Sequence, residues 1–334
     1  MKISTFALLT ILMPLFFGCA SKQQTPDWVL GDSSDYKPAQ YLVGRGQANN
    51  QEEARDRARA DLSKIFQVAV AVESEDMQKF NSGAGSAGEY ENRVTRSIIT
   101  RTDQIVRGIQ IVEMWHDPKK QSFHALAILP RLQTSASLRQ QIEQLDEATA
   151  EHIERSRINP DLFLKIAAAN LAVEAQEERA AVQRSLQVVD ITGRGVEEKW
   201  NRVKMKSDLD GLLKRVRISP QVTADSTIGL ENIFAGALAQ TGFMIESGAS
   251  PDFVLQARMK LDDLGFQDGW YWQRGVLEVS LSETQHDRVR GTQRWNIKGN
   301  AADRGTAIKR ALNQADTVLK QELRDAIIDM ATSR

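Results

Sequence analysis

Apolar and polar residues follow two different periods in the amino-terminal half of the chain, which predicts both strands and helices. Residues 41–48 form an apolar run broken by glycines, as expected of a buried strand. An asparagine cap at 49–50 and acids at 52–53 then begin a helix. Its predicted apolar face comprises Ala54, Ala58, Leu62, Ile65 and Phe66. Residues 67–73 place a valine at every second position, which predicts a further strand.

Two apolar runs, at residues 108–115 and 123–129, flank Asp117-Pro118-Lys119-Lys120 and predict a β-hairpin. From residue 132 to 182 the apolar positions return to helical spacing, interrupted by Asn159-Pro160. We therefore expect an antiparallel pair of helices, most simply a connector between domains, with a coiled-coil partner site as the alternative. Their periodic positions are Leu138, Ile142, Leu145, Thr149, Ile153, Phe163, Ile166, Ala167, Asn170 and Val173.

In the carboxyl-terminal part, the order of the predicted strands and helices along the chain is typical of a sheet that is covered by helices on one face. Strands are expected at residues 216–220, 242–245, 253–261, 275–281 and 294–298, and helices at 230–238 and 307–330. The predicted fold class is α+β, with two small α/β-sandwich domains joined by the helical pair and preceded by a lipoprotein signal peptide.

The amino terminus has the pattern of a signal peptide. Lys2 precedes an apolar run at residues 6–17 that is too short to span a membrane. The single cysteine of the chain, Cys19, follows directly, and the segment resembles a bacterial lipoprotein signal. That resemblance implies cleavage before Cys19, its acylation, palmitate included, and a lasting membrane anchor. A plain secretory signal with an incidental cysteine is the alternative.

Ala20 stands where an aspartate retains many lipoproteins at the inner membrane, so we expect the outer membrane, with the chain facing the periplasm. The expected parts are a signal peptide at 1–18, a lipidated tether at 19–27, an α+β domain at 28–131, a helical connector at 132–183 and a second α+β domain at 184–334. About nine extended tether residues reach roughly 30 Å, which keeps the first domain near the membrane.

Composition argues against several classes of function. Among 334 residues, 43 Lys and Arg balance 44 Asp and Glu, and a formal charge of −1 predicts no nucleic-acid binding. The histidines show no pair at helical ligand spacing, although His116 and His124 flank the hairpin and could face each other. Asp262 and Asp263 are interpreted as solvated charges in a loop. We therefore predict no metal site, no cofactor and no enzyme activity.

Two glycine patterns resemble phosphate-binding motifs. Gly44 and Gly46 lie between a strand and a helix, where close helix packing is favoured over an anion site. Gly83, Gly85 and Gly88 have the spacing of a dinucleotide fingerprint, but no predicted strand precedes them, which indicates a linker.

Several short motifs are spread across residues 26–131. They are Pro26-Asp27-Trp28, Tyr41-Leu42-Val43-Gly44-Arg45-Gly46-Gln47-Ala48, Glu53-Ala54 with Ala58 and Leu62, and Gly108 with Val112-Glu113-Met114-Trp115-His116-Asp117. With these motifs the segment resembles the LPP20-like family of bacterial outer-membrane lipoproteins. The family includes a flagellar assembly lipoprotein, and the resemblance implies no catalytic residues. Residues 239–245 and 250–257 look like the domain shared by the TolB amino-terminal region, the curli secretion lipoprotein and lipoprotein activators of penicillin-binding proteins.

Trp270-Tyr271-Trp272 is the densest aromatic cluster, expected at the end of a hairpin. Large exposed aromatics are costly, so they either pack as a lid on the core or contact a partner. We expect a non-enzymatic scaffold or assembly factor for a flagellar or secretory envelope structure, with an envelope protein as partner. A regulator of a peptidoglycan-synthesising enzyme is the alternative, and self-association is left open.

Overall fold

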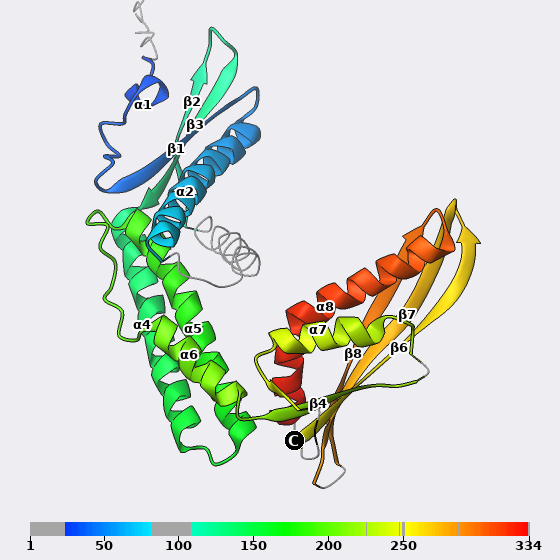
Figure 1. Ribbon diagram of the computed structural model, residues 1–334. Helices are drawn as coiled ribbons and strands as arrows, with labels where there is room; N and C mark the ends of the chain where they lie inside the picture. The colour runs from blue at the N-terminus through cyan, green and yellow to red at the C-terminus, as the bar shows by residue number, and fades with distance from the viewer. Residues whose placement is uncertain are drawn as a thin grey trace, which may run out of the picture. The chain divides into compact units, whose positions relative to one another are not determined.

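A computed structural model of the chain describes residues 24–81, 108–224, 226–246, 248, 251–285 and 288–332, with backbone alone at 71–81 (Figure 1). The described residues form two compact units. The first contains the residues up to Val68 and those from Gly108 to Arg131, and the second contains Ala69–Asn81 and the residues from Leu132 onward. Mixed helices and sheets confirm the predicted α+β class.

The first unit is a three-stranded antiparallel sheet with a long helix against it. Its strands are β1 (Tyr41–Ala48), β2 (Gln110–Asp117) and β3 (Ser122–Pro130), in the order β1-β3-β2. The short helix α1 (Asp27–Leu30) precedes the sheet. The predicted hairpin is confirmed, because β2 and β3 pair antiparallel around the turn after Asp117.

Helix α2 (Gln51–Asn81) is longer than predicted, and the expected strand at 67–73 is wrong. The helical repeat already places Phe66 and Val70 on the core face four residues apart, and both are buried. Val68 is exposed, so the valine alternation does not build a sheet face. Ile65 is also exposed, contrary to its predicted place on the apolar face.

The central strand β3 is buried on both sides. Helix α2 covers one side, and Trp28 of α1 covers the other, where it packs with Trp115 and Leu126. The Trp28 indole donates a hydrogen bond to Glu113, and the Arg45 Nε donates to the Trp28 carbonyl oxygen at 2.8 Å. These contacts fasten α1 to the sheet.

The second unit begins with helices α4 (Arg131–Ile158), α5 (Leu162–Val189) and α6 (Arg202–Leu213). The predicted break at Asn159-Pro160 is confirmed, and Asp161 caps α5 by accepting a bond from the Leu164 N–H at 3.0 Å. Helix α6 was not predicted, because only Leu209 and Leu213 along its length are buried. Phe163 and Ile166 of α5 join the core beneath the carboxyl-terminal sheet.

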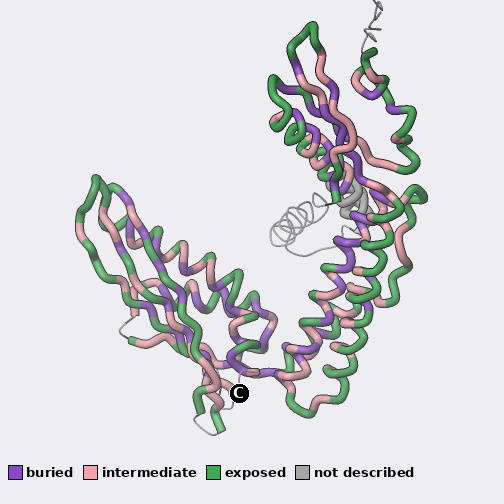
Figure 2. The backbone as a smooth tube through the Cα atoms, turned by 180° about the vertical axis from the view of Figure 1, so that it is seen from behind, coloured by how far each residue is buried: buried purple, intermediate pink, exposed green. Residues whose placement is uncertain are grey.

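That sheet has five strands in the order β5-β4-β6-β7-β8. Its members are β4 (Arg217–Val222), β5 (Met244–Ile245), β6 (Phe253–Gln267), β7 (Trp270–Glu283) and β8 (Arg288–Ala301). Strand β4 runs parallel to β5 and β6, and the others pair antiparallel. Buried and exposed positions alternate along β6 to β8 (Figure 2).

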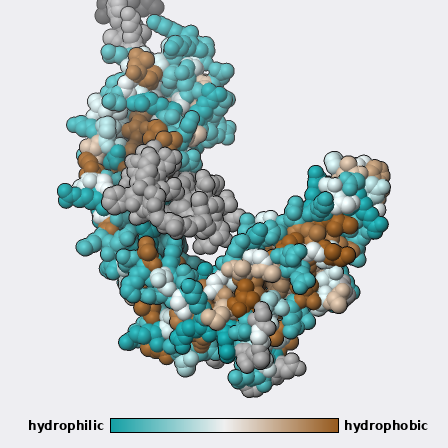
Figure 3. Space-filling model, in the orientation of Figure 1, coloured by the Kyte–Doolittle hydropathy of each residue, from teal (hydrophilic) through white to brown (hydrophobic). Residues whose placement is uncertain are grey.

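Helices α7 (Leu230–Gln240) and α8 (Arg304–Thr332) cover the same face of this sheet (Figure 1). Figure 3 shows apolar side chains gathered over these two helices. The predicted helix at 307–330 is confirmed, and Ala311, Ala315, Leu319, Leu323 and Ile327 along one of its faces are all buried. The opposite face of β6 to β8 carries mostly exposed polar side chains.

Candidate functional site

The ribbon formed by β6 and β7 ends in a tight turn at Asp268 and Gly269. Both residues have positive φ, 51° and 82°, and Gln267 pairs with Trp270 across the turn. An Asp-Gly pair in this conformation matches the right-handed twist of a hairpin. Residues 270–272 therefore begin β7, whereas the apolar pattern of the sequence places them between two shorter strands.

Large apolar side chains are concentrated at the end of this ribbon, which we call the aromatic tip. Leu264 is 45% exposed, Phe266 60% and Trp270 42%, while Tyr271 and Trp272 are half-buried. Among the described residues, the core cluster of the second unit includes none of these five side chains. Apolar exposure of this density is typical of an interaction surface. Sequence reasoning missed Leu264 and Phe266, because it ended the first strand at Leu261.

Contacts within the ribbon hold the side chains of the aromatic tip in fixed positions. The rings of Phe266 and Tyr271 meet edge to face with centroids 5.0 Å apart. The Trp272 indole N–H donates to the carbonyl oxygen of Gln267 at 3.3 Å. Rings held by their neighbours lose less side-chain entropy when they meet a partner.

A bulge in β6 explains why Leu264 points outward. The register of β6 against β7 shifts between Asp263 and Gly265, which leaves Leu264 without a direct partner. Asp263 lies in β6, not in the predicted loop, and its carboxylate pairs with Arg304 at 2.7 Å. The beginning of α8 thus supports the ribbon behind the tip.

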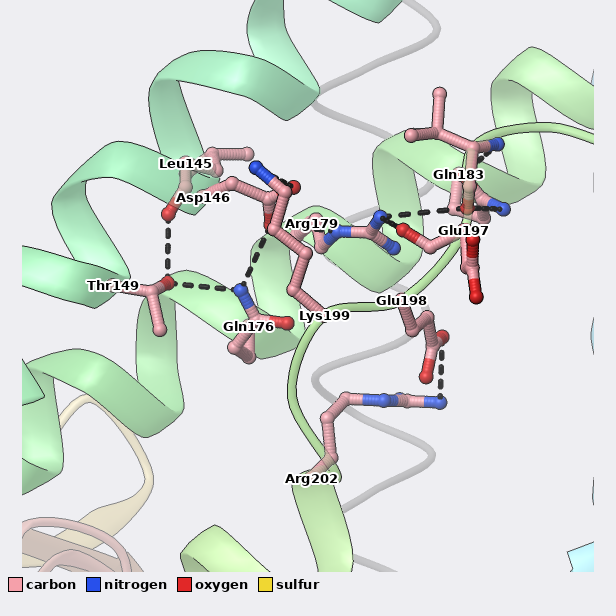
Figure 4. Close-up of polar contacts among 11 residues, drawn as sticks. Leu145, Asp146, Thr149, Gln176, Arg179, Gln183, Glu197, Glu198, Lys199 and Arg202 are labelled. Carbon is pink, nitrogen blue, oxygen red and sulfur yellow. Dashed lines mark hydrogen bonds and ion pairs between the residues drawn. The ribbon is translucent and has the colours of Figure 1, made fainter.

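A second cluster lies between α4 and α5 (Figure 4). Arg179 and Asp146 form an ion pair at 2.9 Å, with side chains only 1% and 2% exposed. Gln176 donates from its Nε2 to the Thr149 hydroxyl at 2.9 Å and to Asp146 at 3.3 Å. Buried charges require such partners, because leaving one unpaired costs several kcal/mol (about 3–5). Periodicity identified Thr149 alone, since the polar members interrupt the apolar repeat.

The same cluster holds the segment that connects α5 to α6. The Arg179 Nη2 donates to the carbonyl oxygen of Glu197 at 2.6 Å. The Gln183 amide group bonds to both the N–H and the carbonyl oxygen of Val196, at 3.1 and 2.8 Å. Lys199 lies 3.9 Å from Asp146. Figure 4 shows these groups converging on the connecting segment. The cluster therefore has a structural role: it holds the segment between α5 and α6 in place.

Close packing accounts for Gly44 and Gly46, as predicted. A Cβ atom on Gly44 would lie 2.6 Å from Leu62, and one on Gly46 would lie 2.1 Å from the Ala54 carbonyl oxygen. Helix α2 therefore occupies the space where an anion would have to bind. The packing interpretation is confirmed for both glycines.

The two hairpin histidines do not face each other. His116 pairs with Phe123 and His124 pairs with Trp115, so the two side chains project from opposite faces of the sheet. Burial lowers the pKa of His124. Within the described ranges, no three His, Cys, Asp or Glu side chains lie together in a way that could hold a metal ion.

Cys19 and the glycines at 83, 85 and 88 lie outside the described residues, so their predicted roles stay predictions. Among the helices that the structure describes, none is long and apolar enough to cross a membrane.

Comparison with known families bears on the first unit. Residues 26–129 match the family model described as LPP20 lipoprotein. Residues 26–129, most of the first unit, are therefore similar to the LPP20 lipoprotein family. The resemblance predicted for residues 26–131 is thereby confirmed, whereas the resemblance of the carboxyl-terminal part to the TolB-type domain stays a prediction. No curated protein matches the chain.

Several solved structures are similar to parts of this chain. The secreted protein HP1454 from Helicobacter pylori shares 12% identity over 84% of this chain and 97% of its own, with a TM-score of 0.41. A minor lipoprotein from Acinetobacter baumannii shares 12% identity over 36% of this chain and 91% of its own, with a TM-score of 0.25. Lipoprotein GNA1162 from Neisseria meningitidis shares 10% identity over 33% of this chain and 99% of its own, with a TM-score of 0.24. These similarities are too distant to transfer a role.

Proposed function

We propose that this protein is lipid-anchored at the outer membrane, faces the periplasm, and acts without catalysis as a scaffold or assembly factor for an envelope structure. The aromatic tip is its contact with a protein partner. The observation that carries this proposal is the exposure of Leu264, Phe266 and Trp270 at one end of a single ribbon. Aromatic side chains bury about 150–250 Å² each, so a few of them suffice as anchors of an interface.

The anchor is proposed at Cys19, and α1 determines how close the folded part stays to it. Trp28 is buried and hydrogen-bonded to Glu113, so the free tether ends near this residue. About nine residues at ~3.5 Å each allow the first unit to lie no farther than roughly 30 Å from the membrane surface.

The anchor is tested by replacing Cys19 with serine in cells labelled with radioactive palmitate. We expect the label to be lost and an unprocessed precursor to accumulate. Labelling that persists in the Cys19→Ser variant would contradict the anchor.

The contact is tested by placing a photo-crosslinking amino acid at position 266 or 270 of the full-length protein in living cells. Val203 on α6 is the control position, because it is more exposed than either tip residue but lies away from the ribbon. We expect one protein adduct common to both tip positions and absent at 203.

A double variant, Phe266→Ser with Trp270→Ser, measures the energetic role of the same surface. We expect the captured partner to be lost while the melting temperature stays within a few degrees of wild type, because neither side chain belongs to the core cluster of the second unit. The proposal would be contradicted if position 203 gave the same adducts as the tip positions. It would also be contradicted if the double variant folded and still captured the partner.

A further inference from the structure

A second interaction surface lies along the outer edge of β8, independently of the aromatic tip. In the part of the chain that the structure describes, β8 is the last strand of its sheet and pairs with β7 alone. From Gly291 to Ala301 its register with β7 is unbroken. A long regular edge of this kind offers backbone N–H and C=O groups to another strand.

The direction of these backbone groups follows from two contacts with α8. The Lys298 N–H donates to the Gln314 side chain at 2.7 Å, and the Asn300 carbonyl oxygen accepts a bond from Arg310 at 2.6 Å. Neither group therefore bonds to β7. In an antiparallel ladder alternate residues turn both backbone groups to the same side. Thr292, Arg294 and Asn296 consequently direct their N–H and C=O groups to the outer edge.

The ends of β8 are protected, whereas its centre is open. Arg310 and Gln314 of α8 cover the edge at Lys298 and Asn300, and a register shift interrupts it before Gly291. The side chains of Thr292, Arg294 and Asn296 are exposed. The open section from 292 to 296 spans about 17 Å at ~3.4 Å per residue, the length of an ordinary paired strand.

Charge indicates what could bind there. Strand β8 carries Arg288, Arg290, Arg294 and Lys298 and no acidic residue. Glu278 and Glu283 of β7 already pair with Arg294 at 2.5 Å and with Arg290 at 3.7 Å, so the excess positive charge beside the open section comes mainly from Lys298 and from Arg274, its partner on β7. A second copy of β8 would bring cations toward cations, which disfavours self-pairing. An extended segment with carboxylates on the face that carries Arg294 and Lys298 would gain both backbone hydrogen bonds and ion pairs.

We propose that the open edge of β8 binds an extended acidic segment of a partner protein, which adds a sixth strand beside Thr292–Asn296. The ladder supplies affinity, and the cations of β8 select acidic over basic sequences. The alternative, in which these cations serve only to keep the edge unpaired, is decided by experiment.

The probe is a fluorescent ten-residue peptide that alternates valine or threonine with glutamate, titrated into the full-length protein in detergent. Its controls are the same peptide with lysine for glutamate, and the glutamate peptide with alternate backbone nitrogens methylated. We expect saturable binding of the acidic peptide only, since methylation removes ladder donors without changing charge.

Two variants locate the site. Asn296→Pro removes an N–H that points away from β7, and we expect about tenfold weaker binding, with Asn296→Ala as the matched control. Lys298→Glu should weaken binding several-fold, whereas Lys64→Glu, the same charge change on α2, should have no effect. The peptide controls still decide the question if Asn296→Pro does not fold.

Absence of acidic-peptide binding would overturn the proposal. Equal binding of the methylated peptide would also overturn it, since attraction would then be electrostatic without strand pairing. Concentration-dependent dimerisation that Asn296→Pro abolishes would assign the edge to a second copy instead.

Discussion

The carbonyl oxygen of Ala54 lies 2.1 Å from the place that a Cβ atom would occupy on Gly46. Real Cβ atoms do not approach oxygen so closely, so this strand position accepts no side chain while α2 keeps its place. The contact couples the sheet of the first unit to its helix through backbone atoms.

We expect Gly46→Ala to destabilise the first unit by about 2–3 kcal/mol, because the helix must move or the strand must distort. Gly211→Ala on α6 is the control, since a Cβ there meets no atom within 4 Å. That change should stabilise by about 0.5–1 kcal/mol through helix propensity. Urea unfolding measures both, and equal effects would refute the packing argument.

For the buried ion pair between α4 and α5, we predict that removing one charge lowers the free energy of unfolding much more than removing both. Arg179→Met leaves Asp146 charged and buried, and we expect a loss of about 3–5 kcal/mol. Asp146→Leu combined with Arg179→Met removes both charges and should recover most of that loss. Chemical denaturation of the wild type, the two single variants Arg179→Met and Asp146→Leu, and the double variant gives the coupling energy. A double variant as unstable as the single one would show that the hydrogen bonds of this cluster stabilise the protein, and that an unpaired buried charge is not the cause of the loss.

Asp252 predicts an acid-sensitive contribution to the stability of the carboxyl-terminal sheet. Hydrogen bonds from the side chain and backbone N–H of Arg217 lower the pKa of Asp252 below its ordinary value. The carboxylate therefore stabilises the fold above its unfolded pKa of about 3.9, and this stability is lost as the pH falls through the lower folded pKa.

We expect Asp252→Asn to flatten the fall in melting temperature below about pH 4. Arg217→Gln should produce a weaker flattening, because it removes the guanidinium, the largest cause of the lowered pKa, while the backbone N–H still donates to Asp252. Asp210→Asn, on the exposed side of α6, should leave the fall in melting temperature below about pH 4 unchanged. A larger effect of Asp210→Asn than of Asp252→Asn would show that Asp252 is not the group responsible.

We predict that Arg45 controls how often helix α1 opens away from the sheet. Its guanidinium donates to the carbonyl oxygens of Trp28 and Gly31, which close α1 onto the sheet. We expect Arg45→Met to speed amide exchange in α1 several-fold without lowering the free energy of unfolding by more than about 1 kcal/mol, since its side chain is partly exposed. Arg59→Met, which removes only a surface pair with Asp56, is the control. Unchanged exchange in α1 would show that Trp28 alone holds the segment.

Periodicity predicted the elements whose burial follows one repeat. The long carboxyl-terminal helix was found because Ala311, Leu319 and Ile327 recur on one face, and the hairpin because two apolar runs flank a turn sequence. The valines at 68, 70 and 72 misled the prediction, since a short alternation fits a strand as well as the end of a helix. Only the continuation from Phe66 to Val70 on one helical face decides between them.

Local sequence by itself determined the α+β class, the close approach at Gly44 and Gly46, and the family resemblance, because each depends on residues near one another in the chain. Tertiary structure alone decided that Arg179 meets Asp146, which lies 33 positions earlier, and that β8 ends its sheet. It also placed Phe266 beside Tyr271 at an exposed tip. Which distant groups meet, and which edges stay unpaired, depends on how whole elements pack, and that information is not present in the period of any single segment.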